Sequence, residues 1–301
     1  MRVLCFGSLN IDYTYQVAHF VQKGETISSE SLQIYSGGKG LNQSVALAKA
    51  GADVYHAGAI GTDGTFLLDV LQEAGAHTQD VCVRSDIRSG HAMIQNDSTG
   101  DNCILLYGGA NQAITRAQVD EVMERFDEGD FIMLQNEINE MPYIMQKAHE
   151  KGLVIVLNPS PMDEKIFKLP LEYVDYFLLN EVEAAQLLSE DAGSQACEWE
   201  LTAKKLRERF PHAAVVLTLG GEGAVYMDDT QTVRQPIYPV QAVDTTAAGD
   251  TFSGYFISGI IRGLSAAQAM DLAARASAIA VTRVGAAPSI PFLAEVEAQA
   301  R

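Results

Sequence analysis

The sequence predicts an α/β protein: a doubly wound, mostly parallel sheet flanked by helices, with a small β-sheet attached to it. From about residue 110 onward, helical stretches alternate with short, continuous apolar runs, a pattern typical of parallel strands that helices cover on both faces. In two earlier regions, residues 11–36 and 90–107, β-branched and aromatic residues alternate loosely with polar ones, which favours antiparallel ribbons. These ribbons would form the small sheet.

The expected elements follow in order along the chain. A first strand is predicted at 3–7 and a helix at 42–50, which Gly51 ends as a C-cap. Beyond the second ribbon, helices are expected at 115–126, 141–151, 181–189 and 198–210. They alternate with apolar runs of strand length at 131–134, 153–157, 176–179 and 214–217, and a last apolar helix covers 253–262. Because no repeat, low-complexity tract or linker divides the chain, we expect one domain over residues 1–301.

The composition describes a globular and acidic chain. Of its 301 residues, 47% are hydrophobic and the mean hydropathy is +0.01, which suits a large buried core. With 21 Lys and Arg against 39 Asp and Glu, the net charge is −18 and the pI about 4.6. This charge argues against a chain-wide affinity for nucleic acid or for an anionic membrane. We therefore expect small-molecule partners, and an anionic one would need local Lys or Arg, backbone N–H groups or a metal.

The cysteines, the histidines and the start of the chain predict neither export nor a metal centre. Six histidines show no HxxxH pair, so we interpret them as structural or surface residues. The apolar run after Met1 is too short for a signal peptide, and no stretch of about 18 apolar residues occurs, which predicts a cytoplasmic protein without a membrane segment. We expect reduced thiols, because no CxxC pair is found among Cys5, Cys82, Cys103 and Cys197.

The segment with the strongest chemical signal is 243–252, which leads into the last predicted helix. Its small residues Ala247, Ala248 and Gly249 let the backbone approach a ligand closely, and their N–H groups lie where a helix start favours an anion. Asp250 beside them could take a proton from an alcohol that attacks a phosphoryl group. The alternative is that Asp250 only stabilises the helix N-terminus.

Two further segments carry hydrogen-bonding side chains near a turn. In SGGKGLNQ at 36–43, Lys39 and Asn42 stand among glycines at a helix start and suit contacts with a polyol or a phosphate; a plain strand-to-helix turn is the alternative. After the first strand, Asn10 and Asp12 are two residues apart and so share a face of the chain. Together they offer donors and acceptors for sugar hydroxyls, or simply an Asx turn.

The predicted parallel strands end at polar residues, and open α/β sheets bind ligands beyond these strand ends. The polar ends lie at 135–137, 158, 180–183 and 218, which indicates a site along this edge. The motifs GxxxxGK[ST], GxGxxG and GxSxG are absent from the sequence. Their absence excludes a P-loop NTPase and argues against a nicotinamide oxidoreductase or a serine nucleophile elbow.

Taken together, these segments resemble the ribokinase-type (PfkB) family of sugar kinases over nearly the whole chain. The matching segments are GSLNID at 7–12, KGET at 23–26, GGKGLNQS at 37–44, GGAN at 108–111, LNPSP at 157–161, LLNEVEA at 178–184, TLGGEG at 218–223, DTTAAGDTF at 244–252 and AVTRVGAAPSIP at 280–291. DTTAAGD and GGKG-x-NQ, in this order and spacing, are highly specific.

The resemblance implies roles for single residues. Asp250 would deprotonate the sugar hydroxyl, and the amides of Ala247, Ala248 and Gly249 would bind the transferred phosphoryl group. The sugar would be held by Asn10, Asp12, Gly38, Lys39, Asn42 and Glu137. ATP would be covered by Asn180, Thr218, Gly220, Gly221, Gly223 and Gly249. Glu183 would organise Mg²⁺ through water, and K⁺ would lie beside Asp244, Thr246, Ala280, Arg283, Gly285 and Ser289.

In this family the ribbons at 11–36 and 90–107 would form a lid that excludes water when closed and that also makes a homodimer contact. The chain departs from the family pattern at Val21-Gln22, where Pro usually precedes KGET, and at Gly100-Asp101-Asn102, where GEN is more usual. It also has Ala274 where a nucleotide-contacting His or Asn is common. These departures concern the lid turn and the affinity for the nucleotide, not the chemistry.

The resemblance therefore implies ATP-dependent phosphorylation of the primary hydroxyl of a pentose. D-ribose O5 is the expected acceptor, because Asn10, Asp12, Asn42 and Glu137 stand where a fully hydroxylated furanose would be bound. Another pentose, deoxyribose or a nucleoside are the alternatives within the family. A non-catalytic sugar-binding descendant is an alternative of another class, although such a protein would not need Asp250.

Overall fold

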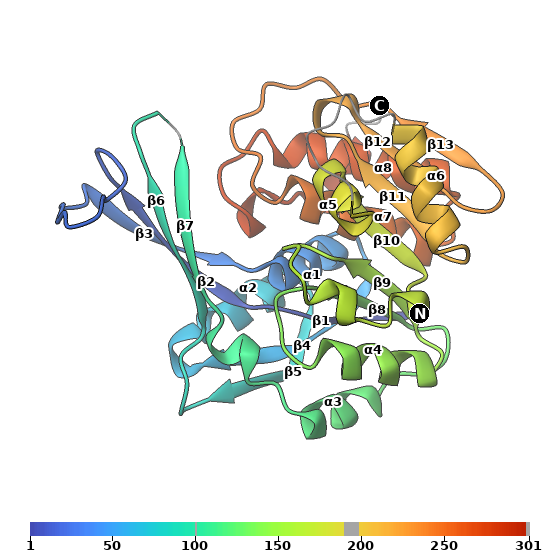
Figure 1. Ribbon diagram of the computed structural model, residues 1–301, viewed down its shortest axis with the longest axis horizontal. Coiled ribbons are helices and arrows are strands. Elements are labelled where there is room, and N and C mark those ends of the chain that lie inside the picture. The colour runs from blue at the N-terminus through green and yellow to red at the C-terminus, as the bar shows by residue number, and fades with distance from the viewer. Residues whose placement is uncertain (100, 190–198, 299–301) are drawn as a thin grey trace.

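The structure is a computed structural model that describes residues 1–99, 101–189 and 199–298. These residues form a nine-stranded sheet between two layers of helices and a separate four-stranded sheet that extends to one side of the body (Figure 1). The fold class predicted from the sequence is confirmed. Within the described ranges, no helix combines the length and the apolarity needed to cross a membrane.

The large sheet is parallel except at one edge. In spatial order its strands are β13 (Thr232–Gln235), β12 (Ala224–Met227), β11 (Ala214–Thr218), β10 (Tyr176–Asn180), β9 (Val154–Asn158), β8 (Phe131–Gln135), β1 (Arg2–Phe6), β4 (Asp53–Gly61) and β5 (His77–Arg84). Neighbouring strands from β11 to β5 run parallel, whereas β12 and β13 are antiparallel. The C-terminal ends of the parallel strands therefore share one edge, where a ligand site is expected.

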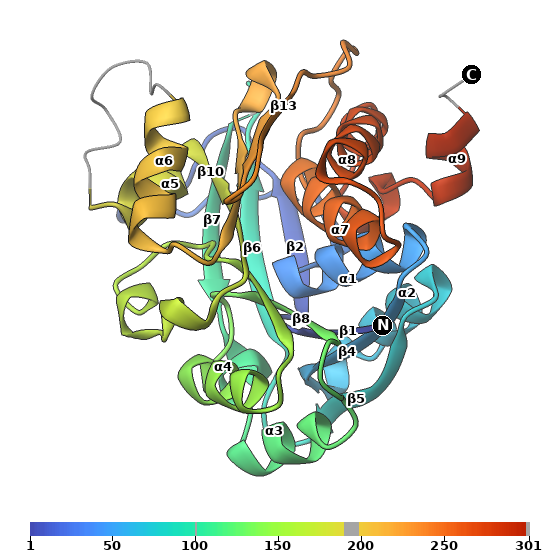
Figure 2. The same ribbon diagram turned by 90° about the vertical axis from the view of Figure 1, so that its right-hand side faces the viewer.

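Each face of the large sheet carries its own apolar core. Along β8, Phe131 and Met133 belong to one core, and Ile132 and Leu134 to the other, as the strand period of two requires. The first core packs against α1 (Lys39–Lys49), α2 (Phe66–Ala74), α7 (Ala248–Ile261), α8 (Ala266–Ala280) and α9 (Leu293–Ala298). The second packs against α3 (Arg116–Met123), α4 (Met141–Glu150), α5 (Glu181–Leu187) and α6 (Trp199–Arg209). Figure 2 shows the two helical layers on opposite sides of the sheet.

The second sheet, called the small sheet below, has the order β3 (Ser31–Gly37), β2 (Asn10–Gln16), β6 (Gly90–Asn96) and β7 (Asn102–Tyr107). It contains the strands of both predicted ribbons, with β2 and β6 parallel and the other pairs antiparallel. Because β2 follows β1 after three residues, Asn10 and Asp12 lie where the two sheets meet. The outer strand β7 is exposed along its whole length.

Several elements were not predicted from the sequence, namely β4, α2, β5, α8, β12 and β13. Strand β4, next to the edge strand β5, reads DVYHAGAIG and lacks a bulky apolar run. Close packing explains the small residue at Gly58, because a Cβ there would lie 2.7 Å from the Gly7 carbonyl oxygen. The helices α1 and α7 begin at Lys39 and Ala248, three and five residues earlier than expected, because their glycine-rich first turns are helical.

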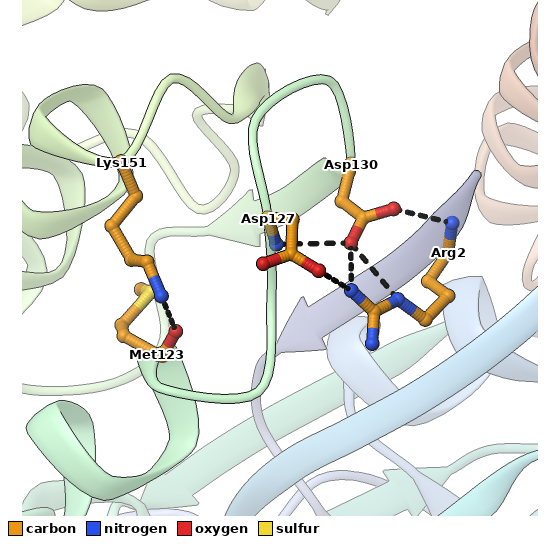
Figure 3. Close-up of polar contacts among 5 residues, drawn as sticks. All are labelled: Arg2, Met123, Asp127, Asp130 and Lys151. Carbon is orange, nitrogen blue, oxygen red and sulfur yellow. Dashed lines mark hydrogen bonds and ion pairs between the residues drawn. The ribbon is translucent and has the colours of Figure 1, made fainter.

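A charged cluster joins the N-terminal edge of the sheet to the loop before β8 (Figure 3). The Arg2 backbone N–H donates to Asp130 Oδ1 at 2.8 Å, and the Arg2 guanidinium donates to Asp130 Oδ2 at 2.9 and 2.6 Å. The guanidinium also reaches Asp127 at 2.9 Å, and the Asp127 N–H donates to Asp130. Burial opposes ionisation, but these hydrogen bonds outweigh it and hold the pKa of Asp130 below its usual value.

Three of the four cysteines lie in the described residues. Cys5 is buried, Cys82 and Cys103 are exposed, and all three are free thiols, as predicted. Burial raises the pKa of the Cys5 thiol to about 11, so this group is neutral. Cys197, Glu198 at the start of a predicted helix, and Gly100 at the GEN-like position lie outside the described residues.

Candidate active site

The first turn of α1 is pressed against the end of β1. A Cβ on Gly40 would lie 2.4 Å from the Ser8 backbone nitrogen, so this position has no room for a side chain. Gly38, with φ of 94°, adopts the left-handed conformation that favours glycine. The Leu41 N–H then donates to the Ser8 carbonyl at 2.9 Å. These glycines therefore bring the following residues, among them Lys39 and Asn42, to the C-terminal edge of the sheet.

The turn before α7 has a strained backbone. Ala247 adopts φ of 61°, a left-handed conformation that costs a non-glycine residue about 1–2 kcal/mol. Within the described residues, the Ala247 and Gly249 N–H groups have no acceptor, whereas the Ala248 N–H donates to the Thr245 carbonyl at 3.1 Å. Two of the three predicted anion-binding amides are thus available, and the third would first have to leave its turn hydrogen bond.

The Asp250 carboxylate is nearly buried and is bound by side chains of α1. Asn42 Nδ2 donates to Asp250 Oδ2 at 3.1 Å, and Gln43 Nε2 donates to Asp250 Oδ1 at 2.9 Å. A helix cap would instead accept backbone N–H groups of its own helix. Asp250 lies in the first turn of α7, and its carboxylate makes its hydrogen bonds across a contact between α7 and α1.

Lys39 is surrounded by carboxylates. Burial lowers the pKa of its ammonium, but the negative charges of Asp250, Glu137 and Glu183 outweigh burial and raise it. Lys39 therefore stays protonated. Because all three acids come from other elements, a single cation balances charges that the fold gathers at the strand ends.

The predicted sugar-binding residues lie between the two sheets. Glu137 Oε2 accepts hydrogen bonds from Ser8 Oγ and from the Lys39 N–H, the latter at 2.9 Å. Burial raises the pKa of Glu137. The pKa of Asp12 is raised to about 7, first by burial and then by the charge of Glu137. Asn10 Oδ1 accepts from Asn111 Nδ2 at 2.7 Å.

Asp12 is fitted closely against its neighbouring strand. A Cβ on Gly37 would lie 2.1 Å from Asp12 Oδ2, so glycine is required beside this carboxylate. The two residues come from β2 and β3, and Asn10 pairs directly with Gly37. The structure thus brings Asn10, Asp12, Gly38, Lys39 and Glu137 into one region, as the sequence predicted.

Two adjoining cavities lie beside the start of α7. The first, about 250 Å³, is lined by Lys39, Asn158, Asn180, Glu183, Thr218, Ala247, Ala248, Gly249 and Asp250, among others. The second, about 390 Å³, is lined by Thr218, Gly220, Gly221, Gly223, Ala248, Gly249 and Ala274, together with apolar residues such as Ile237, Val240 and Val281. Thr218, Ala248 and Gly249 line both cavities. The predicted phosphoryl-transfer and nucleotide residues therefore share one continuous wall.

Asn180 and Glu183 form a capping box at the start of α5. Asn180 Oδ1 accepts the Glu183 N–H at 2.8 Å, and Glu183 Oε2 accepts the Asn180 N–H at 3.0 Å. Both residues also line the 250 Å³ cavity. Among the residues that the structure describes, no group of three or more His, Cys, Asp or Glu could by itself hold a metal ion. A carboxylate that contacts a cation through water, as predicted for Glu183, fits this donor set.

The residues predicted to lie near a monovalent cation come from two adjacent loops. Asp244 Oδ1 accepts the Thr246 N–H at 2.9 Å, and Asp244 Oδ2 accepts the Gly285 N–H at 2.8 Å. The Val281 carbonyl accepts the N–H groups of Val243 and Asp244. The side chains of Arg283 and Ser289 bond elsewhere, to Glu295 and to the Ala286 carbonyl, and the Ala280 carbonyl accepts the Arg283 N–H. A cation here would therefore depend on backbone oxygens, which suits K⁺.

Sequence reasoning missed two buried glutamines and a serine. Gln43 and Gln135 are each 1% exposed, and Gln135 Nε2 donates to Gln43 Oε1 at 2.6 Å. Ser8, fully buried, donates to Glu137. Signals for them existed: Gln43 follows Asn42 in the GGKG-x-NQ segment, and Gln135 is one of the polar strand ends. Neither signal says what the side chain contacts.

Two solved structures similar to the chain are ribokinases. A ribokinase from Cryptococcus neoformans in complex with ADP has a TM-score of 0.86 at 32% identity and covers 99% of each chain. An Arabidopsis thaliana ribokinase complexed with ribose and ATP has a TM-score of 0.86 at 26% identity, covering 99% of this chain and 97% of that one. Fold and site together therefore define an ATP-dependent sugar kinase.

Sequence comparison gives the family. The model of the pfkB family of carbohydrate kinases matches residues 1–293. The ribokinase of Staphylococcus aureus is 35% identical over 98% of both chains, and that of Schizosaccharomyces pombe is 35% identical over 99% of this chain and 97% of its own. The chain belongs to the pfkB family of carbohydrate kinases. The resemblance noted in the sequence is confirmed.

Proposed function

We propose that this chain transfers the γ-phosphoryl group of ATP to O5 of D-ribose and releases ribose 5-phosphate. The observation that carries the proposal is the place of Asp250, in one cavity with Lys39, Glu183 and the turn 247–249. The ribokinase relatives support ribose as the acceptor, and Asn10, Asp12 and Glu137 are the residues proposed to hold it. A deoxyribokinase of Salmonella typhi is 28% identical, so 2-deoxyribose is the alternative to be tested first.

The proposed mechanism assigns each residue one task. Asp250 accepts the proton of the sugar hydroxyl while the new O5–phosphorus bond forms and the bond from phosphorus to the bridging oxygen of ADP breaks. The free amides of Ala247 and Gly249 and the Lys39 ammonium bind the charge on the transferred oxygens. Asn10, Asp12, Gly38, Asn42 and Glu137 orient the sugar.

The nucleotide would occupy the 390 Å³ cavity, with its phosphates directed to the smaller one. Thr218, Gly220, Gly221 and Gly223 form its wall on the strand side, and Asn180 lies at the junction. Glu183 would hold Mg²⁺ through water. When bound there with ATP, Mg²⁺ would supply positive charge to the phosphates. The loops at Asp244 and 280–289 would hold K⁺ behind the turn, through backbone oxygens.

We further propose that residues 1–301 act as one domain whose small sheet is a lid over the sugar and a homodimer contact. The outer strands expose many apolar side chains, including Leu32, Ile34, Ile104, Leu105 and Leu106. An exposed apolar sheet surface of this kind favours association with a second copy. The net charge of −18 argues against nucleic-acid partners, and a cytoplasmic location suits the supply of ATP.

A coupled assay of ADP release tests the proposal. The purified protein is given ATP and Mg²⁺ with ribose, 2-deoxyribose, other pentoses or nucleosides, each with K⁺ or with a large organic cation instead. We expect ribose to give the highest kcat/KM, and K⁺ to raise kcat. A site that binds a hydroxyl discriminates strongly against its absence, so 2-deoxyribose should be markedly poorer. No turnover of ribose, or a better nucleoside, would overturn the proposed substrate.

A further inference from the structure

We propose that Gln43 and Gln135 form an amide relay that positions Asp250 for proton transfer; this inference rests on the proposed function. Gln43 lies on α1 directly after Asn42, and Gln135 is the last residue of β8. Each is only 1% exposed, and neither lines either cavity of the site. They are therefore positioning residues that act through Asp250 and do not touch the substrates.

The relay fixes which end of the Gln43 amide faces the carboxylate. A carboxylate is stabilised by the NH₂ end and repelled by the oxygen end of an amide. Gln43 Nε2 donates to Asp250 Oδ1 at 2.9 Å, while Gln43 Oε1 accepts from Gln135 Nε2 at 2.6 Å. If the Gln43 amide turned over, both hydrogen bonds would become repulsive contacts. Gln135 therefore holds Gln43 in the one orientation that serves Asp250.

The orientation of Gln135 is fixed in turn by the end of β1. Gln135 Nε2 lies 3.7 Å from Cys5 Sγ, and the Cys5 thiol faces the Gly40 carbonyl at 3.4 Å. On the other side, Gln135 Oε1 lies so close to Gly7 that a Cβ there would be 2.4 Å away. A chain of hydrogen bonds thus runs from the end of β1 through β8 and α1 to α7.

The relay has a consequence for the base. Asn42 binds Asp250 Oδ2 and Gln43 binds Oδ1, so each oxygen keeps one lone pair for the sugar hydroxyl. The two donors fix the plane of the carboxylate, and general-base transfer depends on such alignment. Without Gln43, the carboxylate would be bound on one oxygen only and would be free to turn away from the sugar hydroxyl.

Other charges also act on Asp250 and must be held constant in the test. Lys39 from α1 is the neighbouring cation, and Glu137 and Glu183 act on Lys39. Cys5, whose thiol contacts Gln135, has a pKa of about 11 and is therefore neutral near pH 7. Because Gln43→Met removes the amide without changing any of these charges, a loss of kcat at an unchanged sugar KM would report the lost hydrogen bond.

The experiment compares kcat and the sugar KM for wild type, Gln43→Met and Gln135→Met, with Gln118→Met as the matched control. Gln118, on α3, also donates one partly buried hydrogen bond, to the Gly58 carbonyl, but lies away from Asp250. We expect kcat of Gln43→Met to fall about 10- to 100-fold, with the sugar KM within about threefold. Gln135→Met should show the same split between kcat and KM, to a lesser degree.

The double variant should lose less than the product of the two single effects, because both act through one hydrogen-bonded chain. Gln118→Met should leave kcat and KM unchanged. If Gln43→Met fails to fold, Gln135→Met decides, since it keeps the bond to Asp250 but frees its orientation. An unchanged kcat in a folded variant, or a loss seen only in KM, overturns the relay. Inactivity of wild type on ribose refutes the proposed substrate instead, and the relay is then measured with the best acceptor of the panel.

Discussion

The two ends of the parallel sheet differ in how far their buried polar atoms are hydrogen-bonded within the protein. At the N-terminal end, Asp130 receives hydrogen bonds from the Arg2 backbone, the Arg2 side chain and Asp127, so its buried oxygens are satisfied within the protein. At the C-terminal end, Asn42 Oδ1, Gln135 Oε1 and Thr251 Oγ1 are buried and have no partner among the described residues. Unpaired buried polar atoms cost free energy, so hydrogen bonding within the protein is less complete at this end than around Asp130.

The same contrast appears in the acids of the two ends. The pKa of Asp130 is lowered, since hydrogen bonds from Arg2 outweigh its burial. The pKa of Asp12 is raised to about 7 by burial and by Glu137. One end thus stabilises the charged carboxylate, and the other disfavours it, so that Asp12 keeps its proton to a higher pH.

The largest effect should come from replacing Lys39, the cation at the C-terminal end of the parallel sheet. Replacing Lys39 by Met leaves Asp250, Glu137 and Glu183 without their counter-charge and removes a ligand for the transferred oxygens. We expect kcat/KM to fall about 100- to 1,000-fold, measured by ADP release. Lys151→Met is the control at the other end, because the Lys151 side chain donates to the Met123 carbonyl, far from Asp250, and its loss should leave turnover unchanged (Figure 3). Equal losses of kcat/KM in both variants would contradict this difference between the two ends.

The pH dependence of stability should distinguish the two ends by sign. Native Asp12 keeps its proton up to about pH 7, whereas an unfolded Asp loses it near 3.8, so the native state binds more protons in this window. The free energy of unfolding should therefore fall as pH rises from 4 to 7, by at most about 4 kcal/mol. Asp12→Asn should flatten this slope in urea titrations at several pH values. An unchanged slope in Asp12→Asn would contradict the assignment.

Asp130 should act in the opposite direction and at lower pH. Its native pKa is below that of the unfolded chain, so its stabilisation is present above about pH 4 and is lost as the pH falls through the native value. Arg2→Met should reduce stability at pH 7 by about 2 kcal/mol, because it removes hydrogen bonds to a charged group while kcat stays the same. Asp127→Asn is the control, since its side chain is 86% exposed and should contribute little. A loss of kcat in Arg2→Met without a loss of stability would contradict the purely structural role of the N-terminal end.

Local sequence patterns were sufficient for the fold and for the turn at 247–250, because both depend on residues that are close together in the chain. They were insufficient for β4, whose alanines and glycines are dictated by the nearby backbone of Gly7 and carry no strand pattern. They were also insufficient for the partners of Asp250. Gln43 is 207 residues away from Asp250, and Gln135 is 92 residues from Gln43, so only the folded structure brings them together.

The most direct test of the account is Asp250→Asn, measured by sugar binding and by turnover together. Isothermal titration with ribose should give a Kd within about threefold of wild type, because Asn10, Asp12 and Glu137 still orient the sugar. Turnover should fall about 100- to 10,000-fold, since an amide cannot accept the hydroxyl proton. A variant that phosphorylates ribose at the wild-type rate would contradict the account.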